Sequence, residues 1–437
     1  MSSTVFPVSQ QFTPPMRLQV LAIGFLLLLV AGAVLTDPVR HERARLISST
    51  TTTSAAHAFR QVSTDAAWNA GTQEGTRVSG GSVTLGKPAG TLTYAGQRWS
   101  WARWTSWWVQ PGQSFTQLIP SWNVVTPNGT WVQVQARVRS STGRVSGWKV
   151  IASWATRDTG FRRTSAGRQA DAVAGVSTDT LVAASGVSLT GYQLRILPLR
   201  STSSTATPTV RSLQAVASRP SSALPATSRP LLPAKTLSVP RYSQMIHSGE
   251  YPQWGGGGQA WCSPTSLSMI LGYYRSLPSH SNYAWVSSRY ADPWVDHVAR
   301  VVYDYGYDGA GNWAFNTAYA ADLVSGDAFV TRLTSLREAE QFIAAGIPLA
   351  ASISFSRGQL TGAPISATNG HLVVISGFTR SGDVVVNDPA APNDASVRRT
   401  YDRGQFERAW LRKSSGTVYV VRDSAHPLPA RGSHRNW

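Results

Sequence analysis

The sequence predicts two domains, an N-terminal all-β sandwich or jelly roll followed by a C-terminal α+β domain. The chain has 437 residues, which is about three times the length of a domain of about 150 residues. Apolar and polar residues alternate at period two in much of the first half, a pattern typical of strands, whereas the second half mixes helical and strand patterns. Residues 219–235, rich in proline and serine, separate the halves and predict a linker.

Composition excludes several classes of protein. Hydrophobic residues make up 42% of the chain and charged residues 14%, so the chain has enough apolar material for packed cores and is not disordered throughout. Cys262 is the one cysteine, which excludes an intrachain disulfide and a cysteine-rich structural metal site. The sequence has no phosphate-binding loop of the G-x-x-x-x-G-K-[ST] type, which argues against a nucleotide-driven enzyme.

Residues 1–35 predict a secretory signal peptide or a membrane anchor. Leu18–Leu35 is apolar, Arg17 precedes it, and Ala31–Ala33 offers a small-residue cleavage site. An uncleaved anchor is the alternative, because the 18 residues of the apolar run nearly suffice to span a bilayer. Either interpretation places the protein outside the cytoplasm, as a secreted or cell-wall-associated protein or as a membrane-anchored one. Residues 36–60 are polar and predict a flexible spacer.

Residues 61–218 predict the β domain. Trp131–Arg139 and Tyr192–Ile196 alternate as half-buried strands do, and Asn128-Gly129 is typical of the turn between two hairpin strands. No convincing helical period is found in this part of the sequence.

The basic charge of the chain is concentrated in this β domain. The whole chain has a formal net charge of +18; residues 61–218 hold 15 basic and 5 acidic residues, a net +10, whereas residues 238–425 hold 15 of each. Ten of the 17 tryptophans also lie in residues 61–218. These features favour binding to an anionic cell-wall polymer or to sugar rings. The alternative is that the tryptophans fill the core. Nucleic-acid binding is not expected, given the predicted export and the lack of a nucleic-acid motif.

Residues 236–425 predict the α+β domain. Pro264 opens an amphipathic helix that runs to Tyr274. Two further helices are predicted from Asp292 to near Gly306 and from Ser335 to Gly346, the second with a capping box. Strands are predicted at Leu349–Phe355, His371–Phe378, Asp383–Asn387 and Thr417–Val421. The tail, residues 426–437, is predicted to be disordered.

Cys262 is the candidate nucleophile. It directly precedes the helix predicted from Pro264, where unpaired amides and the helix dipole lower the pKa of a thiol. The glycine run at Gly255–Gly258 lets the backbone approach a substrate closely. A buried, inert cysteine is the alternative.

A nucleophilic thiol needs a base and a group that orients that base. His371 opens a predicted strand, and the next strand ends at Asp388. Because the turn Ser381-Gly382 joins the two strands, Asp388 is expected to lie near His371 across the pair. His247, in a polar loop closer to Cys262 in sequence, is the alternative base.

These motifs resemble those of the double-glycine (bacteriocin-processing) peptidase-like family of papain-like cysteine peptidases, in particular the secreted type of actinobacteria. The resemblance rests on Val239–Gln244, Trp261–Ser266, Gly370-His371 and Asn387–Pro389, and it covers residues 236–425. It implies a papain-like peptidase fold for the α+β domain. It does not imply processing of bacteriocin leaders, because the chain has no ATPase region and at most one apolar membrane segment.

The resemblance also implies roles for single residues. Cys262 corresponds to the nucleophile, His371 to the base and Asp388 to the residue that orients it. A glutamine upstream of the cysteine supplies the oxyanion-hole donor in the family; its sequence context points to Gln244, and Gln259, three residues before Cys262, is the alternative.

The sequence therefore predicts an exported thiol hydrolase, a cysteine peptidase that needs no cofactor or metal and acts on proteins or peptides. The first alternative is a peptidoglycan peptide hydrolase or amidase anchored to the wall by the β domain. The second is a non-catalytic cell-surface binding protein, against which the complete Cys262, His371 and Asp388 set argues.

Overall fold

The computed structural model describes residues 56–221, 223 and 225–437. The predicted signal peptide or anchor and most of the predicted spacer lie outside these residues. Within them, no helix combines the length and the apolar character needed to cross a membrane.

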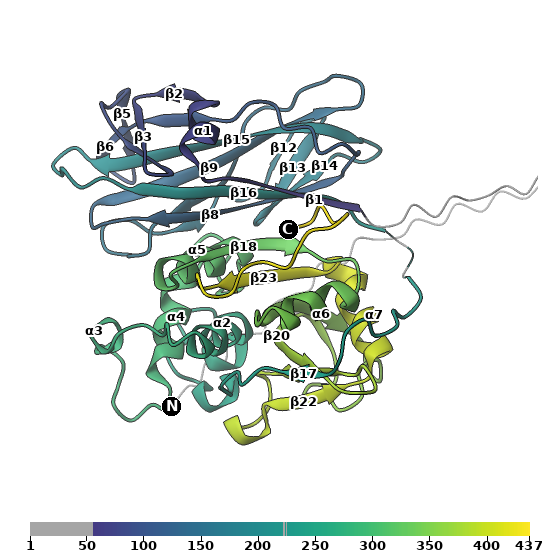
Figure 1. Cartoon of the computed structure of the whole chain (residues 1–437). Helices are drawn as coiled ribbons and strands as arrows, with labels where there is room; N and C mark the ends of the chain where they lie inside the picture. The colour runs from purple at the N-terminus through teal and green to yellow at the C-terminus, as the bar shows by residue number, and fades with distance from the viewer. Residues whose placement is uncertain (1–55, 222, 224) are drawn as a thin grey trace, which may run out of the picture. The chain divides into compact units, whose positions relative to one another are not determined.

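Two antiparallel sheets form the N-terminal region (Figure 1). One sheet has the order β12 (Gln169–Ala170), β13 (Ala174–Ser177), β14 (Thr180–Ala183), β8 (Gln117–Val125), β16 (Thr209–Arg219), β4 (Ser82–Leu85) and β3 (Thr76–Ser79), with β1 (Ala56–Val62) paired to β16. The other has the order β11 (Thr164–Ser165), β10 (Lys149–Trp154), β9 (Thr130–Ser140), β15 (Leu189–Ser201), β6 (Gln97–Trp101) and β5 (Gly90–Tyr94), with β7 (Arg103–Thr105) on β15 and β2 (Thr72–Glu74) on β7. We refer to them as the first and second β sheets. A short helix, α1 (Asp65–Asn69), joins β1 to β2.

The alternating patterns produce the strands predicted from them. In β9 the residues from Val132 to Arg139 alternate between buried apolar and partly exposed polar side chains, so that one face of the strand enters the core. Gly129 turns the chain between β8 and β9 with a φ of +75°, a backbone conformation that suits glycine. The predicted hairpin is wrong here, because β8 and β9 belong to different sheets and do not pair. The tryptophans of the β region were predicted either to fill the core or to bind a ligand at the surface. Six are buried, whereas Trp101, Trp107, Trp108 and Trp148 are partly or fully exposed.

The C-terminal region is built on one antiparallel sheet flanked by helices. Its strand order is β18 (Asp327–Arg332), β23 (Thr417–Arg422), β19 (Leu349–Phe355), β20 (Thr368–Phe378), β21 (Val384–Asn387) and β22 (Arg398–Tyr401), with β17 (Lys235–Thr236) paired to β20. The helices are α2 (Cys262–Tyr273), α3 (His280–Tyr283), α4 (Pro293–Val302), α5 (Trp313–Leu323), α6 (Leu336–Ala344) and α7 (Arg403–Ser414), with 3₁₀ turns η1 (Gln244–His247), η2 (Gly258–Ala260) and η3 (Asp394–Ser396).

Helices α2, α4 and α6 and strands β19, β20, β21 and β23 lie where the sequence predicts them, with shifts at their ends. Helix α4 stops at Val302, not near Gly306. Ser335 caps α6 without a side-chain hydrogen bond, because the carboxylate of Glu338 instead accepts hydrogen bonds from the backbone and hydroxyl of Thr334. The predicted capping box is therefore wrong at this helix.

The two regions share one hydrophobic core. Helix α5 and strand β18 pack on β8 of the first β sheet (Figure 1), and a single cluster of buried apolar residues runs through both regions. Phe315 of α5 packs against Trp154, with ring centroids 4.9 Å apart, and Phe59 of β1 packs against Phe329 of β18 at 4.5 Å. This contact buries apolar surface from both regions, so neither fold is independent of the other in this structure.

Buried polar groups join the same two regions. Arg163, which is 1% exposed, donates to the carbonyls of Ala155 and Thr156 in the N-terminal region and to that of Arg300 at the end of α4. On the other side, Asp327 of β18 accepts hydrogen bonds from the side-chain amides of Gln61 and Asn123. These buried groups fix the contact in one geometry because each would be costly without its partner.

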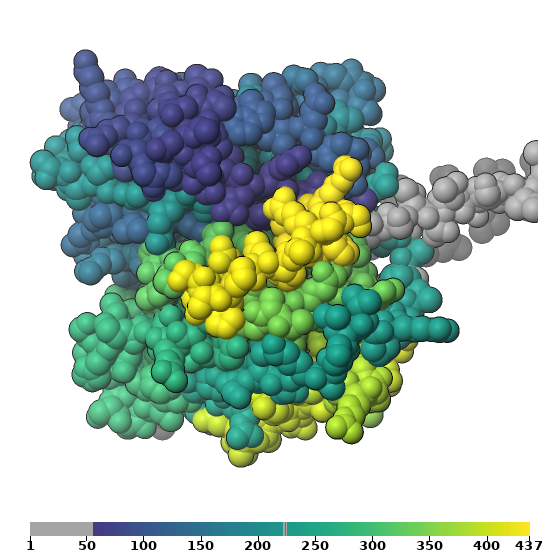
Figure 2. Space-filling view, in the orientation of Figure 1, coloured from purple at the N-terminus to yellow at the C-terminus, as the bar shows by residue number. Residues whose placement is uncertain are grey.

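Both predicted flexible ends differ in the structure. The predicted spacer through residue 60 is wrong at its end, because β1 begins at Ala56 and pairs with β16. The predicted disordered tail is also wrong. Trp437 is fully buried and packs against Phe342, and the amide of Asn436 donates to the carbonyl of Arg332. Figure 2 shows these last residues, in yellow, lying along both regions, consistent with the hydrogen bond from Phe59 N–H to the Arg435 carbonyl.

We expect Arg163→Met to lower the free energy of unfolding by about 2–4 kcal/mol, because the backbone carbonyls of Ala155, Thr156, Arg300 and Tyr303 lose a charged donor. Urea unfolding followed by tryptophan fluorescence measures the change. Arg168, an exposed arginine on the other side of β11, is the matched control, and Arg168→Met should change the value by less than about 0.5 kcal/mol. Equal stability of the two variants would show that Arg163 does not hold the regions together.

Candidate active site

A helix N-terminus and a glycine-rich loop place the thiol of Cys262. Cys262 is the first residue of α2, with Pro264 in the first turn. Gly255, Gly256 and Gly257 have φ values of +72°, +94° and +98°, a region of backbone space that favours glycine. At Gly258 an added Cβ would lie 2.2 Å from the backbone of His247. The glycines are therefore needed for the loop to pass close to its own neighbouring backbone.

Helix α2, which begins at Cys262, is fixed by burial and by a hydrogen bond to β20. The predicted amphipathic helix is instead buried on all sides from Ser263 to Leu271, because it lies between the sheet and helices α4 and α5. The hydroxyl of Ser266 donates to the carbonyl of Leu372 at 3.0 Å, which ties the helix to β20. The position of the half-buried Cys262 is thus fixed relative to the strand that carries His371.

His371 and Asp388 meet as the strand pairing predicts. Strands β20 and β21 pair in an antiparallel register with Val374 opposite Asn387. Nε2 of His371 lies 2.8 Å from Oδ1 of Asp388, and both side chains are buried. Because this bond occupies Nε2, Nδ1 is the ring nitrogen available to the Cys262 thiol.

The electrostatics of the three groups favour a thiolate–imidazolium pair. Burial raises the pKa of the Cys262 thiol, but the hydrogen bond to His371 and its positive charge outweigh burial and hold that pKa below its usual value. Burial lowers the pKa of His371, but the charge and hydrogen bond of Asp388 raise it to about 10. Burial likewise acts to raise the pKa of Asp388, yet its interactions with His371 lower it, so Asp388 stays ionised.

Tyr401 belongs to this group, although the sequence analysis missed it. Its hydroxyl donates to Oδ2 of Asp388 at 2.7 Å, and the backbone N–H of Ala390 donates to Oδ1 at 3.0 Å. These donors fix the carboxylate in the orientation that faces His371. No sequence signal pointed to Tyr401, because it lies in β22, a strand that was not predicted.

The two candidate glutamines differ in their surroundings. Gln244 is buried in η1, and its side-chain amide donates to the carbonyl of Gln259 at 2.7 Å, so it points to the backbone that leads into Cys262. The side chain of Gln259 is exposed and is bound to its own loop, since its amide donates to the Gly256 carbonyl and its oxygen accepts from Gly249 N–H. The structure therefore groups the side chain of Gln244 with the backbone that leads into Cys262 and binds the side chain of Gln259 to its own loop.

The Val239–Gln244 motif is hydrogen-bonded to the segment that contains Asp388. The backbone N–H of Gln244 donates to the carbonyl of Pro389 at 2.9 Å, and the side chain of Asn387 donates to the carbonyl of Pro240 at 2.8 Å. The motifs that are separate in the sequence thus form one hydrogen-bonded unit.

His247, the alternative base, lies elsewhere. Its Nδ1 is 2.9 Å from Oε2 of Glu250 and 3.3 Å from Oδ2 of Asp296, and the side chain is fully buried. The structure therefore groups His247 with two carboxylates and His371 with the thiol.

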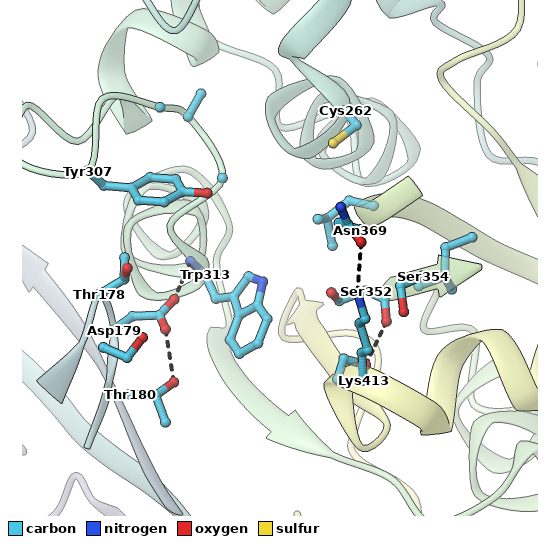
Figure 3. Close-up of a pocket in the computed structure, with 18 of the residues that line it drawn as sticks. Thr178, Asp179, Thr180, Cys262, Tyr307, Trp313, Ser352, Ser354, Asn369 and Lys413 are labelled. Carbon is cyan, nitrogen blue, oxygen red and sulfur yellow. Dashed lines mark hydrogen bonds between the residues drawn. The ribbon is translucent and has the colours of Figure 1, made fainter. Parts of the chain in front are cut away.

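A cavity of about 660 Å³ opens in front of Cys262 (Figure 3). Figure 3 shows Tyr307 on one side of it and Ser352, Asn369 and Lys413 on the other, with the ammonium of Lys413 donating to the side chain of Asn369 at 2.8 Å. The backbone on either side of His371, Gly370 and Leu372, also lines the cavity. The cavity can therefore place a bound group next to the thiol.

The β region forms part of the wall of this cavity. The turn between β13 and β14 contributes Thr178, Asp179 and Thr180 (Figure 3). The carboxylate of Asp179 accepts hydrogen bonds from the backbone N–H of Trp313, at 3.0 Å, and from the hydroxyl of Thr180. The residue at the tip, Thr178, has a φ of +53°, which is uncommon for a β-branched residue. Both regions of the chain thus shape one cavity.

Comparison with known proteins finds one family model that matches each region of the chain. The model of the Peptidase C39 N-terminal domain matches residues 58–218, and the model of the Peptidase C39 like family matches residues 236–418. The chain belongs to the C39-like peptidase family. This confirms the resemblance found in the sequence and places the chain among cysteine peptidases in general. In this C39-like peptidase, the residues that line the cavity come from both matched segments.

Among solved structures, the chain is similar to a protein from Bacillus anthracis described as a C39-like peptidase. The two sequences are 17% identical, the match covers 44% of this chain and 98% of the other, and the TM-score is 0.29. No curated protein matches the chain.

We expect iodoacetamide to label Cys262 at a pH below the ordinary thiol pKa of about 8.5, because the labelling rate follows the thiolate fraction. In His371→Ala the positive charge beside Cys262 is lost while the thiol stays buried. The pKa of the thiol should therefore rise, and labelling near neutral pH should slow at least about tenfold. The measurement is the labelling rate against pH by intact-protein mass spectrometry. His280→Ala, at an exposed histidine, is the control and should match the wild type. A wild-type profile like that of free cysteine would contradict the proposed ion pair.

Proposed function

We propose that this protein is an exported cysteine peptidase that hydrolyses peptide or amide bonds with Cys262, His371 and Asp388. The observation that carries the proposal is the hydrogen bond between His371 and Asp388 together with a Cys262 thiol whose pKa is lowered by His371, at the edge of the cavity. A thiol, a base and an orienting group in this order are the requirements of nucleophilic acyl transfer.

Each proton transfer in the proposed reaction uses the imidazole of His371. His371 takes the proton of Cys262, and the thiolate sulfur forms a bond to the carbonyl carbon of the substrate. The resulting imidazolium protonates the leaving nitrogen as the C–N bond breaks, which leaves a thioester on Cys262. His371 then takes a proton from water, and the hydroxide displaces the sulfur to release the acid. The ionised Asp388 keeps the ring in the orientation that these transfers need.

The oxyanion formed in each addition step needs preorganised donors. The backbone N–H of Cys262 belongs to the first turn of α2, where N–H groups have no carbonyl partner within the helix. The side-chain amide of Gln244 has a second N–H beyond the one given to the carbonyl of Gln259. We assign these two donors to the oxyanion.

Peptidoglycan peptides are the second candidate substrate, favoured by one surface of the β region. On the second β sheet, the guanidinium of Arg139 lies 4.1 Å from the ring centroid of Trp108, and that of Arg195 lies 3.7 Å from that of Trp148. Arg137 lies over both tryptophans. We call these five residues the Arg/Trp surface. Its charge and its partly exposed indoles suit an anionic wall polymer or sugar rings.

The Arg/Trp surface and the active-site cavity belong to different sheets. The cavity is lined by the turn between β13 and β14 in the first β sheet, whereas the Arg/Trp surface includes side chains of β9 and β15 in the second. Binding to a wall polymer is therefore compatible with an open cavity. Export to the wall, which the proposal requires, rests on the predicted signal in residues 1–35.

We expect the wild-type protein to release fragments from casein, from peptidoglycan or from both, and Cys262→Ala to lose at least about 10³-fold in rate, because the nucleophile is gone. Mass spectrometry of the products identifies the cleaved bond. Fragments from peptidoglycan alone would select the second candidate substrate, and fragments from casein would select protein. Release that persists in Cys262→Ala would contradict the proposed mechanism, whereas wall binding without any release would favour a non-catalytic binding protein.

We expect Gln244→Ala to lower kcat by about 10²–10³-fold, as the loss of one oxyanion donor does. Gln259→Ala is the matched control and should lower kcat by less than about tenfold, because the Gln259 side chain is exposed and bound to its own loop. Steady-state kinetics on whichever substrate is cleaved gives both values. The reverse order of the two effects would move the donor to Gln259.

A further inference from the structure

A buried cluster of three metal-ligating side chains lies outside the proposed catalytic group. It consists of His247, Glu250 and Asp296, each offering one ligand atom, with these three atoms within 4.8 Å of one another. The side chains of His247 and Asp296 are fully buried and that of Glu250 is 10% exposed. We propose that this cluster binds one divalent first-row transition-metal cation, such as Zn²⁺, and that the cation holds the loop of Gln244 in place.

Asp296 supplies independent support for a cation. Its carboxylate faces His247, yet neither of its oxygens accepts a hydrogen bond from any of the described residues. A buried carboxylate without donors is costly, because it loses its hydration and gains no partner. A cation bound between the three side chains would coordinate Asp296, whose one charged contact among the described residues is with Nδ1 of His247 at 3.3 Å.

The donor set indicates which cations fit. An imidazole nitrogen together with two carboxylate oxygens suits Zn²⁺ and its first-row neighbours, whereas Ca²⁺ and Mg²⁺ prefer oxygen donors alone. Nδ1 of His247 lies 2.9 Å from the Glu250 oxygen and 3.3 Å from the Asp296 oxygen. Ligand atoms about 2.0–2.2 Å from a tetrahedral cation lie roughly 3.3–3.6 Å from one another, so the Asp296 oxygen is already at a suitable distance from Nδ1 and the Glu250 oxygen needs to move outward by a few tenths of an ångström. Two carboxylates and a neutral imidazole also balance a divalent charge.

The cluster connects three segments near the proposed site. His247 ends η1, the 3₁₀ turn that begins with Gln244; Glu250 lies in the loop that leads to the glycines, and Asp296 lies on α4. The backbone of His247 packs directly on Gly258, four residues before Cys262. A cation here would act through the position of Gln244 and the glycine loop, as a structural metal, and it would be present whether or not the protein is a peptidase.

The alternative is that protons alone hold the cluster. With an imidazolium, one carboxylate and one carboxylic acid, the same three side chains are also neutral and need no cation. The sequence analysis predicted that the protein needs no metal, and this alternative agrees with that prediction.

The test uses the full-length chain with Cys262→Ala, because a thiol beside an imidazole can itself bind Zn²⁺. The protein is equilibrated with Zn²⁺, freed of loose metal by gel filtration and assayed by inductively coupled plasma mass spectrometry. Asp296→Asn and His247→Gln are added separately on this background. His280→Gln, which removes an exposed histidine, is the matched control for adventitious binding.

We expect about one Zn²⁺ per chain in Cys262→Ala and in the His280→Gln control, and less than about 0.2 in Asp296→Asn and His247→Gln. At a Zn²⁺ concentration about 100-fold above the Kd, the Tm of Cys262→Ala should rise by at least about 3 °C and fall again with a chelator. Co²⁺ in place of Zn²⁺ should give a visible spectrum of nitrogen and oxygen ligation.

No bound Zn²⁺ and no change in Tm in Cys262→Ala would overturn the proposal, and this result does not depend on how the cluster variants fold. Zn²⁺ that stays bound in a folded Asp296→Asn protein would also overturn it, because the ion would then lie elsewhere. Absence of hydrolysis by the wild-type protein, with Zn²⁺ bound in Cys262→Ala, would bear on the proposed function and not on this site.

Discussion

The hydrogen bond between His371 and Asp388 is the interaction around which the candidate site is arranged. It joins the start of β20 to the end of β21, and the segment after β21 also binds the other motifs: Pro389 accepts from the Gln244 N–H, and Asn387 donates to the Pro240 carbonyl. One short segment therefore sets the position of both the proposed base and the proposed oxyanion donor. A shift of this segment by about 1 Å would disturb both at once, and such shifts are costly for catalysis.

The β region packs on the C-terminal region and helps to form the cavity, so it is not a separate domain. Its first sheet shares a core with α5 and β18, the buried Arg163 joins it to α4, and its β13–β14 turn lines the cavity. A substrate that reaches Cys262 must therefore pass residues of both regions. Arg139 and Arg195 lie over tryptophans on the second sheet and not at the cavity, so the two sheets can serve different tasks within one compact unit.

Local patterns predicted those parts of the fold that depend on nearest neighbours. The alternation in β9 follows from its period, and the pairing that brings Asp388 to His371 follows from the period and turn chemistry of the β20–β21 hairpin. Helix α5 was missed because it is buried along most of its length and has no polar face to give a period. Tyr401 and the β13–β14 turn were missed because their roles arise from tertiary contacts between distant segments, which no local pattern records. For the same reason Trp437 was assigned to a disordered tail, although it is buried against α6.

The two buried histidines show why residue type alone does not define a site. Both are bound to carboxylates, and both lie near Cys262 in space or in sequence. His371 uses Nε2 for Asp388 and keeps Nδ1 for the thiol, so it can take and return a proton. His247 has its Nδ1 directed at two carboxylates and its side chain fully buried, so its proton has no reacting partner. His247 can therefore contribute by holding other residues in place, and the turn that it ends begins with Gln244. In this way the cluster of His247, Glu250 and Asp296 would support the candidate active site.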